Sequence, residues 1–293
     1  MASAFRSGSF PGCGAGRPWA VVLLLTVGAV AGSAQDKNAL KTELVKTGLF
    51  LISGGGCNSL LRLSANGLIV VDGKLPGNYD ALLEQVRKIS QQPIRVLINT
   101  DYHENHTGNN SEFLEDATQI LAQANVKASL AASSPTAAKA GLPTKIYDRS
   151  LTFKLGGVEV QVFHFGDART HGDTVVYFPN LKVVAVGDLF AANPDPDFSA
   201  GGSLTGWGPV LAEILKLDFD VVVPGTGPVV TRADLEAFRK KIDTLISRAI
   251  MLVKNGVPED HLMAQLKTED LGMRLNFTGD RLGSFYAELS RAK

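Results

Sequence analysis

The chain has 293 residues, of which 45% are hydrophobic and 20% are charged. This length suffices for one large domain or two small ones, and the composition supports a sizeable buried core and argues against global disorder. Lys+Arg and Asp+Glu both total 29, so the balanced charge gives no electrostatic reason to expect binding to nucleic acid or to an anionic membrane.

The N-terminal segment has the three parts of an export signal. Arg6 and Arg17 supply positive charge without any acidic residue, an uncharged apolar run covers residues 19–30, and the small residues Gly-Ser-Ala follow. The pattern predicts a signal peptide over residues 1–34 and a secreted or periplasmic mature domain over residues 35–293. A membrane anchor is the alternative, but the run is shorter than the roughly 20 residues that span a bilayer.

Cysteine usage excludes a disulfide framework in the mature chain. The sequence has two cysteines, and Cys13 falls inside the predicted signal peptide. Cys57 is then alone, and we expect it to be buried and inert. The alternative, a catalytic thiol, lacks an obvious basic partner nearby in the sequence.

The first half of the mature chain predicts strands followed by a helix and another strand. Alternating or continuous apolar residues predict strands at Leu44–Ile52, Asn58–Leu63 and Leu68–Asp72. Apolar residues at helical spacing predict a helix over Tyr79–Ser90. A short β-rich run, Ile94–Ile98, follows Pro93 and predicts a buried strand.

The second half predicts the same mixture. A Gly-Gly pair between two short strands indicates a hairpin, and a capping-box pattern at Thr231 predicts a long helix that ends near Lys254. Strands interleaved with helices indicate an α/β fold in which two sheets pack together with helices outside. The remaining predicted strands are Leu151–Leu155, Val158–Phe163, Val175–Phe178, Val183–Val186 and Val221–Val223, and Leu204–Leu217 is the remaining predicted helix.

Residues 99–109 carry the densest polar chemistry. Asp101, His103 and His106 follow a predicted buried strand and precede a Gly/Asn turn, and the whole chain has only five histidines. Neutral imidazole and carboxylate oxygen both suit zinc, so this spacing predicts a metal site. On spacing alone, a polar surface loop remains the alternative.

This segment resembles a motif of the metallo-β-lactamase superfamily. The order Asp101-x-His103-x-Asn105-His106 is similar to the family's His-x-His-x-Asp-His. Three later segments resemble further family motifs in the correct order: Gly166–Asp173, Val186–Phe190 and Pro224–Gly227. The resemblance spans about residues 44–240 and implies an αββα sandwich of two mixed sheets with outer helices and a site at one edge, between the sheets.

The resemblance implies ligand positions that this chain only partly keeps. The family's first metal site falls on Asp101, His103 and Arg169, and the second falls on Asn105, His106, Asp188 and Thr226. Side chains able to hold a metal remain at Asp101, His103, His106 and Asp188. Arg169 has no lone pair to offer, Asn105 is at best a weak carbonyl donor, and the Thr226 hydroxyl is a poor zinc ligand.

Arg169 raises two hypotheses about the altered site. A guanidinium within hydrogen-bonding distance of Asp101 or Asp188 would place fixed positive charge where a cation sits in the family. In the alternative, Arg169 points to solvent and His171, two residues later, becomes a substitute ligand.

Two functions therefore stay open for the mature domain. The first is a single-metal hydrolase of an ester, lactone, amide or thioester, with catalytic positions Asp101, Asn105 and Asp188 and with zinc or another divalent ion. Its activity would be reduced, because Asn105 cannot take a proton as the family's aspartate does. The second is a non-catalytic binding protein, a pseudoenzyme in which Arg169 replaces a metal ion. For both functions we expect a small-molecule substrate or ligand. We expect no binding to nucleic acid, and no association with a membrane once the signal peptide has been cleaved.

Overall fold

The computed structural model describes residues 39–133 and 141–292. The predicted signal peptide, residues 1–34, lies outside the described residues. Within the described part of the chain, no helix combines the length and the apolar character needed to cross a membrane.

The first sheet has seven strands in the order of the sequence. The pairs from β1 to β4 are antiparallel, and the pairs from β4 to β7 are parallel. The carboxyl ends of β4 and β5 therefore lie at the same edge of the sheet. Its strands are β1 (Lys41–Lys46), β2 (Leu49–Ser53), β3 (Ser59–Ser64), β4 (Gly67–Val71), β5 (Ile94–Ile98), β6 (Gln119–Gln123) and β7 (Lys145–Tyr147).

The second sheet has six strands in the order β13-β12-β11-β10-β9-β8. Only the pair β11 and β12 is parallel within it, so the loops that follow these two strands also leave from one edge. Its strands are β8 (Ser150–Leu155), β9 (Val158–Phe163), β10 (Val175–Phe178), β11 (Val183–Gly187), β12 (Val221–Pro224) and β13 (Val230–Thr231).

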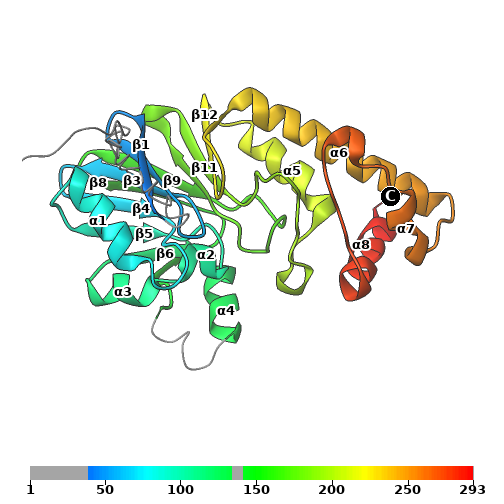
Figure 1. Ribbon diagram of the computed structural model, residues 1–293, viewed down its shortest axis with the longest axis horizontal. Coiled ribbons are helices and arrows are strands. Elements are labelled where there is room, and N and C mark those ends of the chain that lie inside the picture. The colour runs from blue at the N-terminus through cyan, green and yellow to red at the C-terminus, as the bar shows by residue number, and fades with distance from the viewer. Residues whose placement is uncertain (1–38, 134–140, 293) are drawn as a thin grey trace, which may run out of the picture. The chain divides into compact units, whose positions relative to one another are not determined.

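Helices cover the outer face of each sheet (Figure 1). The first sheet packs on α1 (Tyr79–Ile89) and α3 (Asn110–Glu115), and the second packs on α5 (Leu204–Ile214) and α6 (Arg232–Lys254). Helix α8 (Gly279–Arg291) packs on α5 and α6. The predicted αββα sandwich of two mixed sheets with outer helices is confirmed. The remaining helices are α2 (Glu104–Thr107), α4 (Ala124–Ser133), α7 (Glu259–Gln265) and the 3-10 turns η1 (Pro179–Leu181), η2 (Phe198–Ala200) and η3 (Glu269–Leu271).

Side chains that alternate in direction along the strands form the core between the two sheets. Leu49, Leu51 and Leu60 from the first sheet pack with Val160 and Val162 from the second, and all five are buried. Successive side chains of a strand point to opposite faces, so one face of each sheet supplies this core and the other meets the helices. The burial holds the two sheets, and hence the loops at their edges, in a fixed arrangement.

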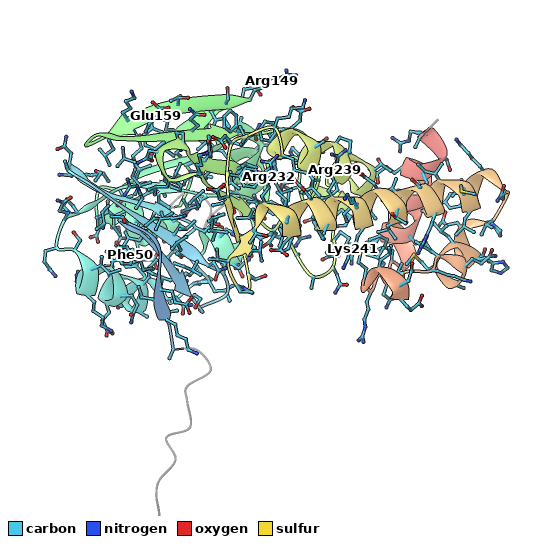
Figure 2. The ribbon with its side chains drawn as sticks, turned by 90° about the horizontal axis from the view of Figure 1, so that it is seen from above. Phe50, Arg149, Glu159, Arg232, Arg239 and Lys241 are labelled. Atoms are coloured by element: carbon cyan, nitrogen blue, oxygen red, sulfur yellow. The ribbon has the colours of Figure 1, made fainter. Side chains whose placement is uncertain are left out.

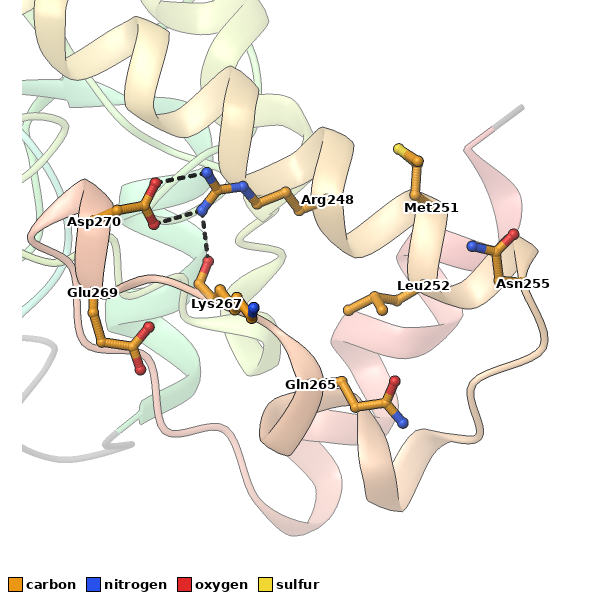
Figure 3. A pocket seen from close by; sticks show the side chains of 8 residues that line it. All are labelled: Arg248, Met251, Leu252, Asn255, Gln265, Lys267, Glu269 and Asp270. Carbon is orange, nitrogen blue, oxygen red and sulfur yellow. Dashed lines mark hydrogen bonds and ion pairs between the residues drawn. The ribbon is translucent and has the colours of Figure 1, made fainter.

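A capping box begins α6, and an ion pair joins this helix to a later turn of the chain. The predicted capping box is present, because Thr231 and Asp234 bond each other's backbone at the start of α6. Further along α6, Arg248 donates from both terminal nitrogens to the two oxygens of Asp270, each at 2.7 Å (Figure 3). This two-point pair joins α6 to η3.

Two sequence expectations differ from the structure. The single strand predicted over Leu44–Ile52 is wrong, because Gly48 adopts a left-handed conformation with φ of 70° and turns the chain between β1 and β2. The helix predicted to end at Leu217 ends at Ile214.

Candidate metal centre

Three loops converge at one edge of the sandwich. Asp72 and Asp101 follow the parallel strands β4 and β5, and Asp188 follows β11 of the other sheet. Ligands in open α/β sheets commonly bind beyond the carboxyl ends of the strands, where loops carry the polar side chains. The topology thus brings carboxylates from both sheets together.

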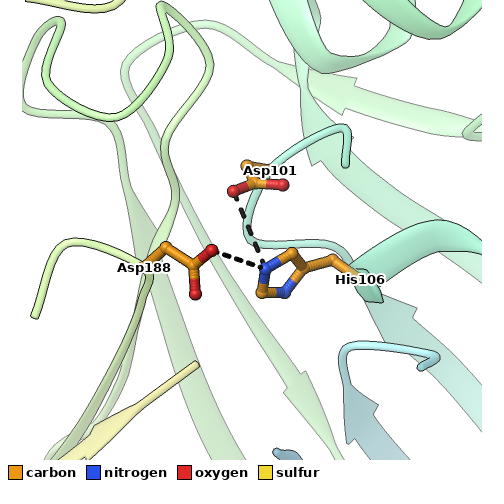
Figure 4. A group of neighbouring side chains, drawn as sticks. All are labelled: Asp101, His106 and Asp188. Carbon is orange, nitrogen blue, oxygen red and sulfur yellow. Dashed lines mark ion pairs between the residues drawn. The ribbon is translucent and has the colours of Figure 1, made fainter. Parts of the chain in front are cut away.

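His106 occupies the centre of this edge (Figure 4). Its side chain is fully buried on the short helix α2. Nδ1 lies 2.9 Å from Asp72 Oδ2, whereas Nε2 lies 3.3 Å from Asp188 Oδ2 and 3.8 Å from Asp101 Oδ2. Asp72 therefore holds Nδ1 of the ring, and Nε2 faces the carboxylates of Asp101 and Asp188.

These side chains fit a divalent cation. Among the described residues, Asp101, His106 and Asp188 form the one group whose ligand atoms all lie within 4.8 Å of one another. Asp101 Oδ2 is buried and has no hydrogen-bond partner in the described part of the chain. When Nδ1 of a neutral His106 donates its proton to Asp72, the lone pair lies on Nε2, as in many metal-bound histidines. One imidazole and two carboxylates suit zinc, manganese or iron.

The charges in this group are strongly coupled without a cation. Burial disfavours the charged form of His106, but the nearby Asp101 and Asp72 carboxylates raise its pKa well above the usual value. Burial likewise opposes ionisation of Asp101, and the positive charge of His106 and contacts from His103 outweigh it and lower the Asp101 pKa. In the absence of a cation the histidine thus carries the compensating charge.

Behind the group, the backbone after β4 is held in an unusual conformation. Asp72 and Lys74 have φ values of 63° and 70°, a region that costs non-glycine residues of order 1–3 kcal/mol. Asp72 accepts two hydrogen bonds from Thr100, which fix its carboxylate against His106. Sequence reasoning missed Asp72, although an aspartate at the end of the predicted strand Leu68–Asp72 was an available signal.

Lys74 is fully buried and was also missed. Its Nζ donates 2.8 Å hydrogen bonds to the backbone carbonyls of Ile52, Gly54 and Cys57. Burial lowers the pKa of Lys74 to about 8, so the ammonium still holds its proton at neutral pH. It ties the turn between β2 and β3 to the loop that carries Asp72. Cys57 itself is buried and unbridged, as expected.

His103 and Asn105, two further predicted site residues, flank the group. His103 Nδ1 lies 3.1 Å from Asp101 Oδ1, and its Nε2 lies 3.4 Å from Asp197 Oδ2. The Asn105 side-chain amide lies 2.8 Å from His106 Nε2. Both side chains are partly exposed, so they line the opening of the site.

Arg169 comes close to the group but not as expected. Its Nε lies 4.0 Å from Asp188 Oδ2, which is an ion pair and longer than a hydrogen bond. Nη1 donates to the Asp195 carbonyl and lies 3.6 Å from the Asp195 carboxylate. The expected hydrogen bond to Asp101 or Asp188 is therefore wrong, because the loop at residues 191–203 supplies competing acceptors for the guanidinium.

The structure does not bring His171 or Thr226 into the group. His171 Nδ1 faces the backbone carbonyl of Ala200, and the carbonyl of His171 accepts a hydrogen bond from Asn125. Thr226 is exposed in the loop after β12. The adjacent Gly225 packs so tightly on Asp188 that a Cβ there would collide with Oδ1.

The loop at residues 191–203 supplies two carboxylates that sequence reasoning did not assign. Asp195 also pairs with Arg281 of α8. Asp197 bonds the Tyr102 hydroxyl and caps η2. Although its partial burial acts in the opposite direction, hydrogen bonds from Ser199 and Tyr102 lower the pKa of Asp197 to about 2. The contacts of Asp195 and Asp197 therefore hold this charged loop beside the site, against Arg169, Tyr102 and His103.

The fold and the site define a family. The model of the Metallo-beta-lactamase superfamily matches residues 52–226, which is more than half of the chain. The chain belongs to this superfamily.

Known relatives are similar over most of the domain. The chain is 28% identical over 225 residues to the 2,4-dinitroanisole O-demethylase subunit alpha of Nocardioides sp. (strain JS1661), covering 76% of this chain and 68% of that protein. It is 27% identical over 211 residues to the Metallo-beta-lactamase type 2 of Bacillus cereus, covering 69% and 78%. The solved metallo-beta-lactamase from Pontibacter korlensis has the same fold, with a TM-score of 0.61 and 20% identity over 70% of this chain and 99% of that one.

Proposed function

We propose that the protein is a hydrolase that uses one divalent metal ion held by Asp101, His106 and Asp188. The observation that carries this proposal is the convergence of these three side chains within 4.8 Å. Three protein ligands leave a coordination position open for water or substrate, as catalytic metal sites require. A metal held there would supply Lewis acidity and lower the pKa of water.

The chain's own residues would orient the reactants. Asp72 holds Nδ1 of His106 and so presents Nε2 to the site. His103, partly exposed between Asp101 and Asp197, is a side chain at the opening that can take a proton. The loop at residues 191–203 limits access of solvent, because Asp195 and Asp197 anchor it to Arg169 and Tyr102.

The metal-binding motif is, in this proposal, degenerate relative to the family. Asn105 stands where a carboxylate would orient water and accept its proton, and a well-placed general base contributes about 10²–10⁴-fold to a rate. We therefore expect hydrolysis slower by that order than in a relative with the full motif. Zinc is the first candidate ion, with manganese and iron as alternatives.

The test is a substrate panel with metal-loaded protein. The panel holds an ester, a lactone, an amide and a thioester, together with a β-lactam and 2,4-dinitroanisole, which the names of the relatives suggest. We expect turnover of at least one member that needs added metal and falls more than about a hundredfold in Asp188→Asn, since a ligand is lost. The matched control is Asp218→Asn at an exposed ion pair with Lys182, which should keep wild-type turnover. Turnover that is equal in the Asp188→Asn variant would refute the assignment.

One observation favours a second function, a non-catalytic binding protein. The Arg169 guanidinium is only 18% exposed and already places a positive charge 4.0 Å from Asp188. A fixed cation of this kind keeps carboxylates ionised without a metal. In that case the group would be a structural or ligand-binding centre.

Replacement of Arg169 by Met separates the two functions. If the site holds a metal, removing the nearby positive charge should tighten zinc binding by about tenfold, or roughly 1.4 kcal/mol. If Arg169 replaces the metal, the wild type should bind no zinc and Arg169→Met should lower the melting temperature by several degrees. Calorimetric zinc titration measures the zinc affinity, and thermal unfolding measures the melting temperature. The control variant is Arg149→Met, at an exposed arginine labelled in Figure 2.

We also propose that the chain is exported. The proposal is supported by the charge pattern and the apolar run of residues 1–34, as described above. Expression of the full-length chain in a bacterial host should yield a mature form that begins near Gln35, and N-terminal sequencing of the exported fraction checks this. Recovery of a chain that begins at Met1 or Ala2 from that fraction would contradict it.

A further inference from the structure

A cavity of about 530 Å³ lies beside the candidate metal centre. Phe190 lines it and lies two residues after Asp188. Pro224 and Thr226 also line it, on either side of the Gly225 that packs against the Asp188 carboxylate. A molecule in this cavity would therefore lie next to the proposed reaction centre.

Most of the cavity is built by the C-terminal part of the chain. The superfamily match ends at residue 226, and most of the lining residues come after it, in the loop after β12, on β13 and α6, and in the turn that follows η3. These residues are Gly227, Pro228, Val230, Asp234, Ala237, Phe238, Lys241, Gly272 and Met273. The cavity thus combines loops of the part that matches the superfamily with a larger share from the C-terminal part of this chain.

The lining is mostly apolar, and Lys241 is the one cationic side chain that the described part of the chain contributes to it. The rings of Phe190 and Phe238 lie 5.0 Å apart and form a wall with Met273. Lys241 of α6, labelled in Figure 2, extends over Gly272, where a Cβ would lie 3.9 Å from Nζ. Among the described residues no carboxylate lies within ion-pair distance of Lys241, whereas Arg239 on the same helix pairs with Asp243.

The charges set an orientation for a ligand. Asp234 also lines the cavity, and Thr231 already holds its carboxylate in the capping box. Lys241 lies seven positions after Asp234, which corresponds to about 10 Å along a helix. An anion is therefore repelled at the first turn of α6 and attracted two turns later.

We propose that this cavity binds an aromatic or branched apolar group that ends in a carboxylate, with the anion at Lys241 and the apolar part against Phe190 and Phe238. In a hydrolysed substrate the scissile acyl group would lie at the Thr226 end, where water adds to the acyl carbon and the leaving group departs with a proton. The assignment of this ligand as a substrate rests on the proposed hydrolase function, whereas the binding does not.

Binding of two model ligands to the full-length protein tests the proposal without catalysis. Phenylbutanoate carries the required anion, and phenylbutanol is its neutral counterpart. Calorimetric titration in the presence of a chelator should show saturable binding of both, with phenylbutanoate favoured by about fivefold, the most that an exposed ion pair supplies. Lys241→Met should remove this preference, and Lys240→Met, at the neighbouring exposed lysine outside the cavity, should keep it.

A second variant tests the location. Ala237 is exposed and lines the cavity, so Ala237→Trp should fill it and abolish binding of both ligands while leaving zinc binding unchanged. The proposal is overturned if the wild type binds neither ligand or does not prefer the anion, if Lys241→Met keeps the preference, or if Ala237→Trp binds like the wild type. A protein that binds phenylbutanoate as expected but hydrolyses nothing would refute only the proposed hydrolase function.

Discussion

His106→Ala should abolish metal binding and also weaken the fold. The imidazole is the only nitrogen donor of the group, so we expect zinc affinity to fall by more than the 10–100-fold typical of outer-sphere partners. In metal-free protein the same change removes the positive charge that faces Asp72, Asp101 and Asp188. Removing one partner of a buried ion pair costs about 3–5 kcal/mol, so the free energy of unfolding should fall by that amount.

Calorimetric zinc titration and denaturant unfolding measure the two effects separately. The matched control is His261→Ala on α7, whose side chain is 64% exposed and should change neither quantity. If His106→Ala binds zinc as tightly as the wild type, His106 is not a ligand and the proposed site is wrong.

Lys74→Met should lower the free energy of unfolding by about 3–5 kcal/mol, since each of several buried acceptors left without a donor costs about 1–3 kcal/mol. The three acceptors are the carbonyls of Ile52, Gly54 and Cys57, all bonded at 2.8 Å. Methionine fills a similar volume, so the loss reports the missing donors more than a cavity. Because Lys74 follows Asp72 in a conformation with positive φ, we also expect metal affinity to weaken.

Denaturant unfolding of the metal-free protein is the measurement for this variant. Lys88→Met is the control, because Lys88 is 57% exposed and its pair with Glu84 should contribute less than about 1 kcal/mol. A loss below about 1 kcal/mol in Lys74→Met would mean that water replaces the ammonium and that Lys74 does not organise this loop.

The fold was predictable because several weak motifs occur in one order along the chain. The segment from Asp101 to His106 and the residue Asp188 were found from local patterns, each at the end of an apolar strand. The structure places both beyond the carboxyl ends of strands, where such loops commonly carry a site. Local sequence patterns were sufficient to find site residues that directly follow one predicted strand.

The missed residues act through partners far away in the sequence. Asp72 acquires its role only because β4 and β5 are parallel neighbours, and Lys74 bonds carbonyls 17–22 residues earlier. Arg169 was expected to bond Asp101 or Asp188, but Asp195, 26 residues later, takes its hydrogen bond. The periodicity of apolar residues carries no information about such non-local contacts. A buried lysine therefore cannot be distinguished from a surface lysine by the sequence pattern.

The central claim is that Asp101, His106 and Asp188 hold one metal ion. Elemental mass spectrometry of the protein after loading with zinc and removal of free metal tests this claim most directly. About one zinc per chain is predicted for the wild type, and none for Asp101→Asn or His106→Ala. No bound metal in the wild type would contradict the claim and support the pseudoenzyme. Two ions per chain would contradict the single-metal site and make His103, which lies 3.1 Å from Asp101, the leading candidate for a further ligand.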